Sequence, residues 1–157
     1  MSTSSRFAIA VHVLTLMAWS DDEPLKSEQM AGSVNTNAVV IRRMLCELAQ
    51  GELVVSQTGS TGGSRLAREP DQITLLDVYR AVECPGVFCL HRKHPSRRCP
   101  VGANIATVLE DVRGQIDFAI EKVLARITIE DVVVRLKPRV RGTGIRKSEL
   151  RTERSPT

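Results

Sequence analysis

The sequence predicts a mainly α-helical fold with one small β-hairpin, and three observations support this. Residues 26–50 form two short helix-like segments separated by a tight turn. Residues 53–67 form two strand-like segments around a glycine-rich loop. Further on, apolar residues recur at helical spacing over 104–126, a stretch longer than a small domain needs. The first two features together are typical of a winged helix-turn-helix, and the third indicates a long dimerisation helix.

Composition and motifs exclude several classes of protein. The chain has 157 residues, 42% of them hydrophobic but only 3% aromatic, so we expect an aliphatic core. No apolar run approaches the roughly 18 residues of a membrane span, and His12 interrupts the apolar start, so we expect a cytoplasmic protein without membrane contact. No Ser–His–Asp, paired-carboxylate or nucleotide-binding motif is present, which predicts that the protein is not an enzyme.

We expect four parts along the chain. Residues 1–83 form the winged helix-turn-helix, 84–103 a cysteine-containing sensor loop, 104–136 the dimerisation helix and a short last helix, and 137–157 a basic disordered tail. The tail carries seven basic and two acidic residues, so the rest of the chain is near neutral although the net charge is +4. A role in DNA binding therefore cannot rest on total charge; the tail either trails across phosphates or is a solvated tail without function.

The first three helices are predicted from capping residues and apolar spacing. A helix capped by Ser4 or Ser5 runs to about residue 20, a short helix starts at Ser27, and residues 32–34 turn the chain. The next helix, 37 to about 50, is capped by residue 35 or 36. The apolar faces that we expect to be buried are Phe7, Val11, Leu14 and Met17 or Ala18 in the first helix, and Val40 or Ile41 with Met44, Leu45 and Leu48 in the third.

The outer face of the third predicted helix carries polar residues near its start. Asn37, Arg42 and Arg43 lie there. In a helix-turn-helix the second helix enters the major groove by its N-terminal end, where arginine holds guanine or phosphate. We therefore expect these side chains to contact double-stranded DNA.

A hairpin follows, with strands at 53–57 and 65–67. Its loop, residues 58–64, lacks the Gly-Lys-Ser/Thr ending of a phosphate-binding loop, so we interpret it as a wing tip. With its small residues and the adjacent Arg65, this tip fits against a minor groove; the alternative is a plain flexible turn. The candidate contacts are Ser60, Thr61, Gly62, Gly63 and Arg65.

The second half of the chain is predicted to be helical around an irregular loop. One helix opens at Ile73 or Thr74, and Pro85 ends it. In the long helix the apolar seam recurs at steps of four and three residues: Ile105, Leu109, Val112, Ile116, Ala119 and Val123. A parallel or antiparallel second copy would cover such a seam, and packing on the chain's own domain is the alternative. A short helix from Thr128 is expected to end at Pro138.

Five segments in order resemble the Rrf2 family of bacterial winged helix-turn-helix transcription regulators: SSRFAIAVHVLTLMA, SEQMAGSVNTNAVVIRRML, GSTGGSRLAREPDQITLLDVYRAVE, CPVGANI and ITIEDVV. The resemblance covers about residues 4–136 and implies a dimeric DNA-binding repressor whose long helix crosses to the partner subunit. It also implies which residues meet DNA. In the recognition helix these are Thr36, Asn37, Val40, Arg42 and Arg43, and at the wing tip they are Gly59, Gly62 and Gly63.

Three cysteines before the long helix suggest two kinds of sensor. Family members that bind an iron–sulfur cluster have three cysteines in this loop, so Cys84, Cys89 and Cys99 are possible ligands, with His91 or His94 as a fourth. The favoured interpretation needs no cofactor: Cys99 sits at the cap of a helix that begins with Pro100, beside several basic residues, which would make it a reactive thiol and a redox sensor. We expect Cys46 to be packed and structural.

The sequence thus predicts a homodimeric transcription regulator that acts as a repressor, with Cys99 as its redox- or stress-sensing residue. An iron–sulfur regulator is the alternative, and a protein-interaction adaptor that does not bind DNA is the second.

Overall fold

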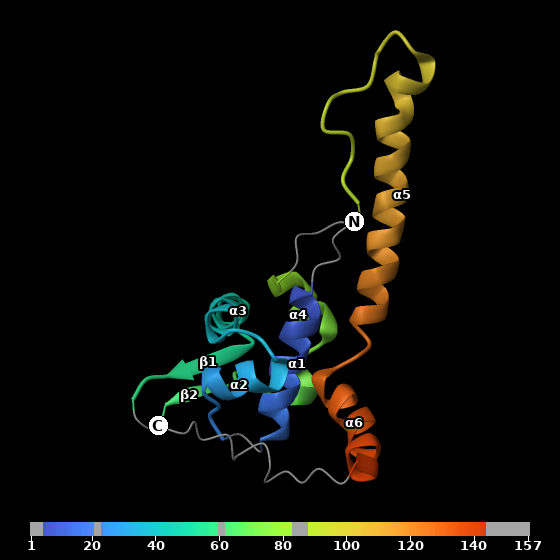
Figure 1. Ribbon diagram of the computed structural model, residues 1–157. Coiled ribbons are helices and arrows are strands. Elements are labelled where there is room, and N and C mark those ends of the chain that lie inside the picture. Colours follow the sequence, from blue (N-terminus) through green and yellow to red (C-terminus); the bar gives the residue numbers. More distant parts are fainter. Residues whose placement is uncertain (1–4, 21–22, 60–61, 83–87, 144–157) are drawn as a thin grey trace.

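A computed structural model describes residues 5–20, 23–59, 62–82 and 88–143. Its first part is a group of short helices with a hairpin on one side, and one long helix stands away from that group (Figure 1). The predicted mainly helical fold with a small hairpin is therefore confirmed. In chain order the elements are α1 (Arg6–Trp19), α2 (Ser27–Val34), α3 (Ala38–Gln50), β1 (Val54–Gln57), β2 (Gly63–Leu66), the 3-10 turn η1 (Pro70–Gln72), α4 (Leu75–Val82), α5 (Pro100–Leu124) and α6 (Ile129–Thr143).

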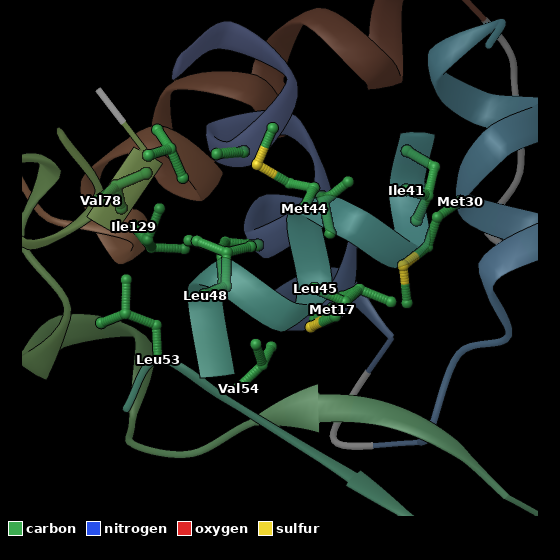
Figure 2. Packing of buried hydrophobic residues seen from close by; sticks show 14 of the residues in the cluster. Met17, Met30, Ile41, Met44, Leu45, Leu48, Leu53, Val54, Val78 and Ile129 are labelled. Carbon is green, nitrogen blue, oxygen red and sulfur yellow. The ribbon is translucent and has the colours of Figure 1, made fainter. Parts of the chain in front are cut away.

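The core is aliphatic, as the composition predicts, and it is shared by α1 to α4, β1 and α6. Figure 2 shows the buried side of α3 meeting residues from the hairpin, α4 and α6. On α1 the buried face is Ala10, Val13, Leu14 and Met17, whereas Phe7 and Val11 are only half-buried. The predicted stripe on α1 was therefore partly wrong, because α2, α4 and α6 all pack against this helix and shift its buried face.

The turn between α2 and α3 lies later than predicted. Helix α2 continues through Val34, and the chain reverses at Asn35, whose φ of 58° is in the left-handed region that asparagine tolerates better than most residues. The N–H of Thr36 then donates to the carbonyl of Ala31 at 3.0 Å. This turn fixes the start of α3 relative to α2.

The hairpin is a two-stranded antiparallel sheet in which Val54 pairs with Leu66 and Gln57 with Gly63. The segment before α2 extends it, because the backbones of Leu25 and Ser64 exchange two hydrogen bonds of 2.9 and 2.8 Å. The second strand thus begins at Gly63, two residues earlier than predicted. The hairpin is thereby attached to the segment that leads into α2.

Helices α4 and α6 begin at a common joint. Thr74 and Thr128 form an isolated antiparallel bridge, with Leu75 N–H donating to the Ile127 carbonyl at 2.8 Å and Ile129 N–H to the Ile73 carbonyl at 2.9 Å. Thr74 caps α4 through Asp77, and Thr128 caps α6 through Asp131 with the same pattern of bonds. We call residues 73–77 and 127–131 the α4–α6 joint.

Helix α6 does not end at Pro138, as predicted, but continues to Thr143. It packs against α1, with Ile129 and Val133 buried. Pro138 removes one backbone N–H, but it lies on an exposed part of the helix, where water can satisfy the carbonyl of the preceding turn. Residues 137–143 are therefore helical and not part of an unstructured tail; the rest of the predicted tail, residues 144–157, lies outside the described residues.

Helix α5 starts at Pro100, four residues before the predicted start, and runs for 25 residues without a buried side chain. It projects from the helical group (Figure 1). Near its C-terminal end it contacts α4, where Arg80 and Glu121 form an ion pair of 2.9 Å. The predicted part 104–136 placed the long helix and the last helix together. In the structure α6 packs on α1 and so belongs to the helix-turn-helix core, whereas α5 has no buried residue.

Candidate functional site

The buried residues of α3 show which side of this helix faces solvent. Ile41, Met44, Leu45 and Leu48 face the core, which decides the predicted choice between Val40 and Ile41 in favour of Ile41 (Figure 2). Val39 and Val40 are consequently on the surface, 49% and 40% exposed. Val39 was not among the predicted site residues, although the same helical spacing that places Ile41 inward places it outward.

Asn37 holds the first turn of α3. It is the N-cap, and its Oδ1 accepts a hydrogen bond of 2.8 Å from the N–H of Val39. The predicted cap, residue 35 or 36, was therefore wrong by one or two positions, because Asn35 is used for the left-handed turn and Thr36 follows it half-buried. Asn37 remains exposed at the tip of the helix.

The two predicted arginines have different surroundings. The Arg42 guanidinium donates to the Glu28 carboxylate of α2, so it ties α3 to α2. The pKa of Glu28 is lowered, first by its own backbone N–H and then by Arg42 against the opposing effect of desolvation. Arg43 is exposed and has no ion pair or hydrogen bond with another residue in the described part of the chain. Arg43 is therefore the more available of the two cations.

The predicted wing tip is only partly described. Ser60 and Thr61 lie outside the described residues. A side chain at Gly62 would place its Cβ 2.3 Å from the Gln57 carbonyl oxygen, and one at Gly63 would come within 2.8 Å of the Leu25 carbonyl oxygen. Both glycines thus allow close backbone contacts within the hairpin, and Gly63 belongs to β2 and not to the tip.

Arg65 and Gly59 complete the described part of the wing. Arg65 is exposed on β2, opposite Val55, which is 44% exposed on the same hairpin. Gly59 has a φ of 121°, which favours glycine. The outer surface of the hairpin therefore presents one cation and one apolar side chain beside the glycine turn.

Cys99 is the N-cap of α5, where the sequence places it. Its side chain is exposed, and its pKa is lowered by the backbone N–H groups of Gly102 and then Val101. These two amides, and not the neighbouring basic side chains invoked from the sequence, account for the lowered pKa. Gly102 also permits the close approach of Ser96, since a Cβ there would lie 2.4 Å from the Ser96 carbonyl oxygen. The arrangement favours a thiolate at the start of a helix.

The other cysteines do not gather around Cys99 in the described residues. Cys46 is exposed on α3, so the prediction that it is packed was wrong; it follows Leu45, and one residue of helical rotation takes it out of the core. Cys89 is also exposed, and Cys84 lies outside the described residues. In the ranges that the structure describes, no three His, Cys, Asp or Glu side chains come together as metal ligands.

No helix in the described ranges is both long enough and apolar enough to cross a bilayer.

Comparisons with known proteins agree with this geometry. The family model Rrf2, described as an iron-dependent transcriptional regulator, matches residues 3–135. YwnA of Bacillus subtilis, which is named as an HTH-type transcriptional regulator, is 40% identical over 131 residues, covering 83% of this chain and 96% of YwnA.

Two solved structures have the same fold. The global cysteine regulator CymR of B. subtilis superposes with a TM-score of 0.62 at 22% identity, covering 85% of this chain and 97% of CymR. T. potens IscR superposes with a TM-score of 0.65, also at 22% identity, covering 95% and 96% of the two chains.

Proposed function

The chain belongs to the Rrf2 family, so it is a DNA-binding transcriptional regulator and not an enzyme. We propose that it is a homodimeric repressor and that Cys99 is its sensing residue. The observation that carries the DNA-binding part is the exposed N-terminal half of α3. Asn37, Val40 and Arg43 share this end of the helix, away from the buried Ile41 and Met44.

The chemistry of this surface suits a major groove. An arginine can bind guanine or phosphate, and an apolar side chain can contact the methyl group of thymine. Arg43 would supply the first contact and Val39 or Val40 the second. In this proposal Arg42 does not contact DNA first but forms an ion pair with Glu28 that links α3 to α2. This link would help the N-terminal end of α3 to keep its orientation. Thr36 lies in the turn, where its backbone positions the helix.

The hairpin would supply a second set of contacts, in a minor groove. Arg65 would reach a phosphate or the groove floor, with the residues around Gly59 passing close to the sugar–phosphate backbone. Gly62 and Gly63 would act indirectly, because they keep the two strands and the Leu25 segment close together.

Dimerisation would occur through α5. Nine residues, or two and a half helical turns, separate Val112 from Glu121, so the two side chains leave α5 on opposite sides. Since Glu121 faces α4 of its own domain, the apolar seam faces away from that domain. Three valines along this face, Val101, Val108 and Val123, are 67%, 55% and 59% exposed, an arrangement that favours a partner helix over packing within the chain.

Cys99 would sense oxidants through its thiolate. The thiolate attacks a peroxide oxygen, which forms a sulfenate on the sulfur and releases water, and the product is larger and still anionic. An iron–sulfur cluster on Cys84, Cys89 and Cys99 is the rival, favoured by the iron-dependent description of the family model. Iron and acid-labile sulfide analysis of protein purified without oxygen separates the two: bound iron that disappears on Cys99→Ser supports the cluster.

The cytoplasmic location and the action as a repressor are both proposed because the partner is promoter DNA. A regulator of chromosomal promoters works in the cytoplasm, and a dimer seated on a promoter represses by excluding polymerase. The rival, an adaptor that uses its winged domain for protein contacts, predicts no protected DNA. Footprinting on the promoter of the protein's own gene distinguishes them.

The test of the DNA surface is a gel-shift series in rising salt with Arg43→Ala. Removal of the Arg43 guanidinium should weaken operator binding by about 1–3 kcal/mol per subunit if it contacts a base, and should reduce the salt slope by about 0.9 for each phosphate that the variant no longer neutralises. Gln50→Ala, at the opposite end of α3, is the matched control and should bind like the wild type. An unchanged affinity and slope for Arg43→Ala would exclude the proposed role of this residue.

A further inference from the structure

An ion pair joins the first turn of α2 to the outer side of α3. Glu28 Oε1 accepts a hydrogen bond from the Arg42 guanidinium, and Glu28 Oε2 accepts one of 3.2 Å from the Ser27 hydroxyl, so both carboxylate oxygens are occupied. The side chains of Glu28 and Arg42 are nevertheless 61% and 56% exposed. Water screens such a pair, and it contributes little to folding. The pair is therefore better explained by a role at the surface.

Arg42 lies at the edge of the proposed groove surface, on the side of α2. Val39 and Arg43 are about one helical turn apart and share a face, whereas Arg42 is rotated by about 100° from Arg43 and meets Glu28 of α2. In a helix-turn-helix the first helix crosses the sugar–phosphate backbone while the second enters the groove. This geometry would place Arg42 beside a phosphate and Arg43 over base edges.

Glu28 puts a negative charge at a helix end that would otherwise favour phosphate. The N-terminal end of a helix attracts anions, and the first turn of α2 carries this carboxylate. The pKa of Glu28 is lowered, first by its own backbone N–H, so the side chain stays ionised at neutral pH. Unpaired, Glu28 would repel DNA of any sequence, and unpaired Arg42 would attract it. The pair therefore cancels two opposite effects at the edge of the groove surface.

We propose that Glu28 is a specificity-determining residue, which withholds Arg42 from phosphate on non-operator DNA and releases it on the operator. This rests on the proposed DNA-binding function and deepens it. On non-operator DNA, α3 finds no matching bases and stays shallow in the groove, so Arg42 keeps its partner on α2. On the operator, base contacts by Val40 and Arg43 draw α3 deeper, and a phosphate replaces the carboxylate. The exposed pair is weak enough for this exchange.

The exchange favours the operator over the rest of the genome. Binding to phosphates supplies nearly all of non-specific affinity, so a cation that is masked on most sequences lowers that affinity selectively. The link between α2 and α3 that the pair provides then belongs to the free protein and to non-operator complexes.

The salt dependence of DNA binding tests this exchange, because each neutralised phosphate adds about 0.9 to the slope of log K against log salt concentration. Fluorescence anisotropy of the full chain is measured in rising KCl with two duplexes: the segment footprinted on the promoter of the protein's own gene, and a scrambled duplex of the same composition. Glu28→Gln is expected to bind the scrambled duplex about three- to tenfold more tightly, with a slope steeper by about 0.9 per subunit. Its slope on the operator duplex should equal that of the wild type, since Arg42 already contacts phosphate there.

A double variant shows whether the gain comes from Arg42. Glu28→Gln combined with Arg42→Gln should bind the scrambled duplex with the wild-type slope, and its operator slope should fall by about 0.9 per subunit. Glu52→Gln removes an exposed carboxylate just beyond the other end of α3 and is the matched control for net charge. It should leave both slopes unchanged.

A purely structural role of the pair predicts a different result. If Glu28 only orients α3, Glu28→Gln should weaken operator binding and leave the slope on the scrambled duplex unchanged, and that outcome would overturn the proposal. A gain on the scrambled duplex that persists in the double variant would also overturn it, because lost repulsion by Glu28 would then be the cause. Wild-type protein that bound both duplexes equally would instead overturn the proposed function, and this inference with it.

Discussion

Asn37 combines two demands on one side chain, since its Oδ1 caps α3 while the residue lies at the end proposed to enter the groove. Asn37→Ala should lower the free energy of unfolding by about 1 kcal/mol through loss of the cap. Asn37→Asp keeps the cap and should retain most of the stability, but its negative charge near phosphate should weaken operator binding. Urea denaturation and gel shifts on both variants check this. Wild-type affinity of Asn37→Asp would mean that the side chain does not face DNA.

Cys99 should react with alkylating agents at lower pH than an ordinary thiol. Its pKa lies below 9.0 because the amides of Gly102 and Val101 stabilise the thiolate, so the reactive form should persist as the pH falls below that value. The measurement is the iodoacetamide rate at Cys99, followed by peptide mass spectrometry from pH 6 to 10, with N-acetylcysteine amide as the reference compound. A rate midpoint at or above that of the reference would contradict the proposed reactivity.

Single positions differ in how far the sequence could predict them. The cap role of Cys99 was predictable because proline is favoured at the first helical position. The cap of α3 was not, since Asn35, Thr36 and Asn37 are all good caps and the choice depends on which one takes the left-handed turn. The Arg42–Glu28 pair joins residues 14 apart in sequence and depends on the angle between two helices, which local spacing does not contain.

The α4–α6 joint is the element where a carboxylate should give a pH-dependent stability. The Thr128 backbone N–H, and then its hydroxyl, lower the pKa of Asp131 below its ordinary value of 3.8. Because the folded pKa is the lower one, the stabilisation is complete above about pH 4 to 5 and is lost as the pH falls through the folded pKa. Asp131→Asn should therefore be less stable than the wild type at pH 7, and the difference should narrow below pH 3.8.

Thermal unfolding from pH 2.5 to 7 at constant protein concentration measures this difference. Glu130→Gln is the control, because it makes the same change of charge in the first turn of α6 without removing the capping bonds. If the difference in unfolding temperature between Asp131→Asn and the wild type stayed constant with pH, the charge of the carboxylate would not be what stabilises the joint.

Elements with strong local signals were predicted and those shaped by distant contacts were not. The hairpin followed from a glycine loop between alternating residues, but its register also depends on Leu25, which pairs with Ser64 from 39 residues away. The end of α6 was misplaced because proline usually stops a helix, while packing of Ile129 and Val133 against α1 secures the turns before Pro138. Tertiary contacts therefore anchor both the hairpin and the part of α6 that precedes Pro138.

The whole molecule should lose its quaternary structure when the seam is charged. Val112→Asp would place two carboxylates near each other at the centre of the proposed interface, so we expect dimerisation to weaken by at least about tenfold, or about 1.4 kcal/mol. Analytical ultracentrifugation measures the dimer, and a gel shift should show a parallel loss of operator affinity. Phe118→Asp adds the same charge to an exposed residue outside the seam and should remain dimeric.

For the whole molecule, the sequence predicted the long helix α5 without a packing partner in its own chain. It did not predict that α6, which follows α5, packs back onto α1. A seam of regular spacing is visible in the sequence, and the absence of buried residues on α5 agrees with it. The packing of α6 on α1 joins segments more than 100 residues apart. The sequence hints at the pairing that makes this possible only through the segments ITLLD and ITIED of the joint, which share their Ile, Thr and Asp residues.

The return of α6 also has a consequence for how the protein is made. Ile129 is fully buried and completes a core that begins with Ala10 and Leu14, so that core stays open on one side until the ribosome has added the residues after α5. Domains usually fold as units during synthesis, the N-terminal one first. Here a nascent chain with all of its helix-turn-helix translated still lacks the packing of α6, and competence to bind an operator should arise only after α6 has been translated.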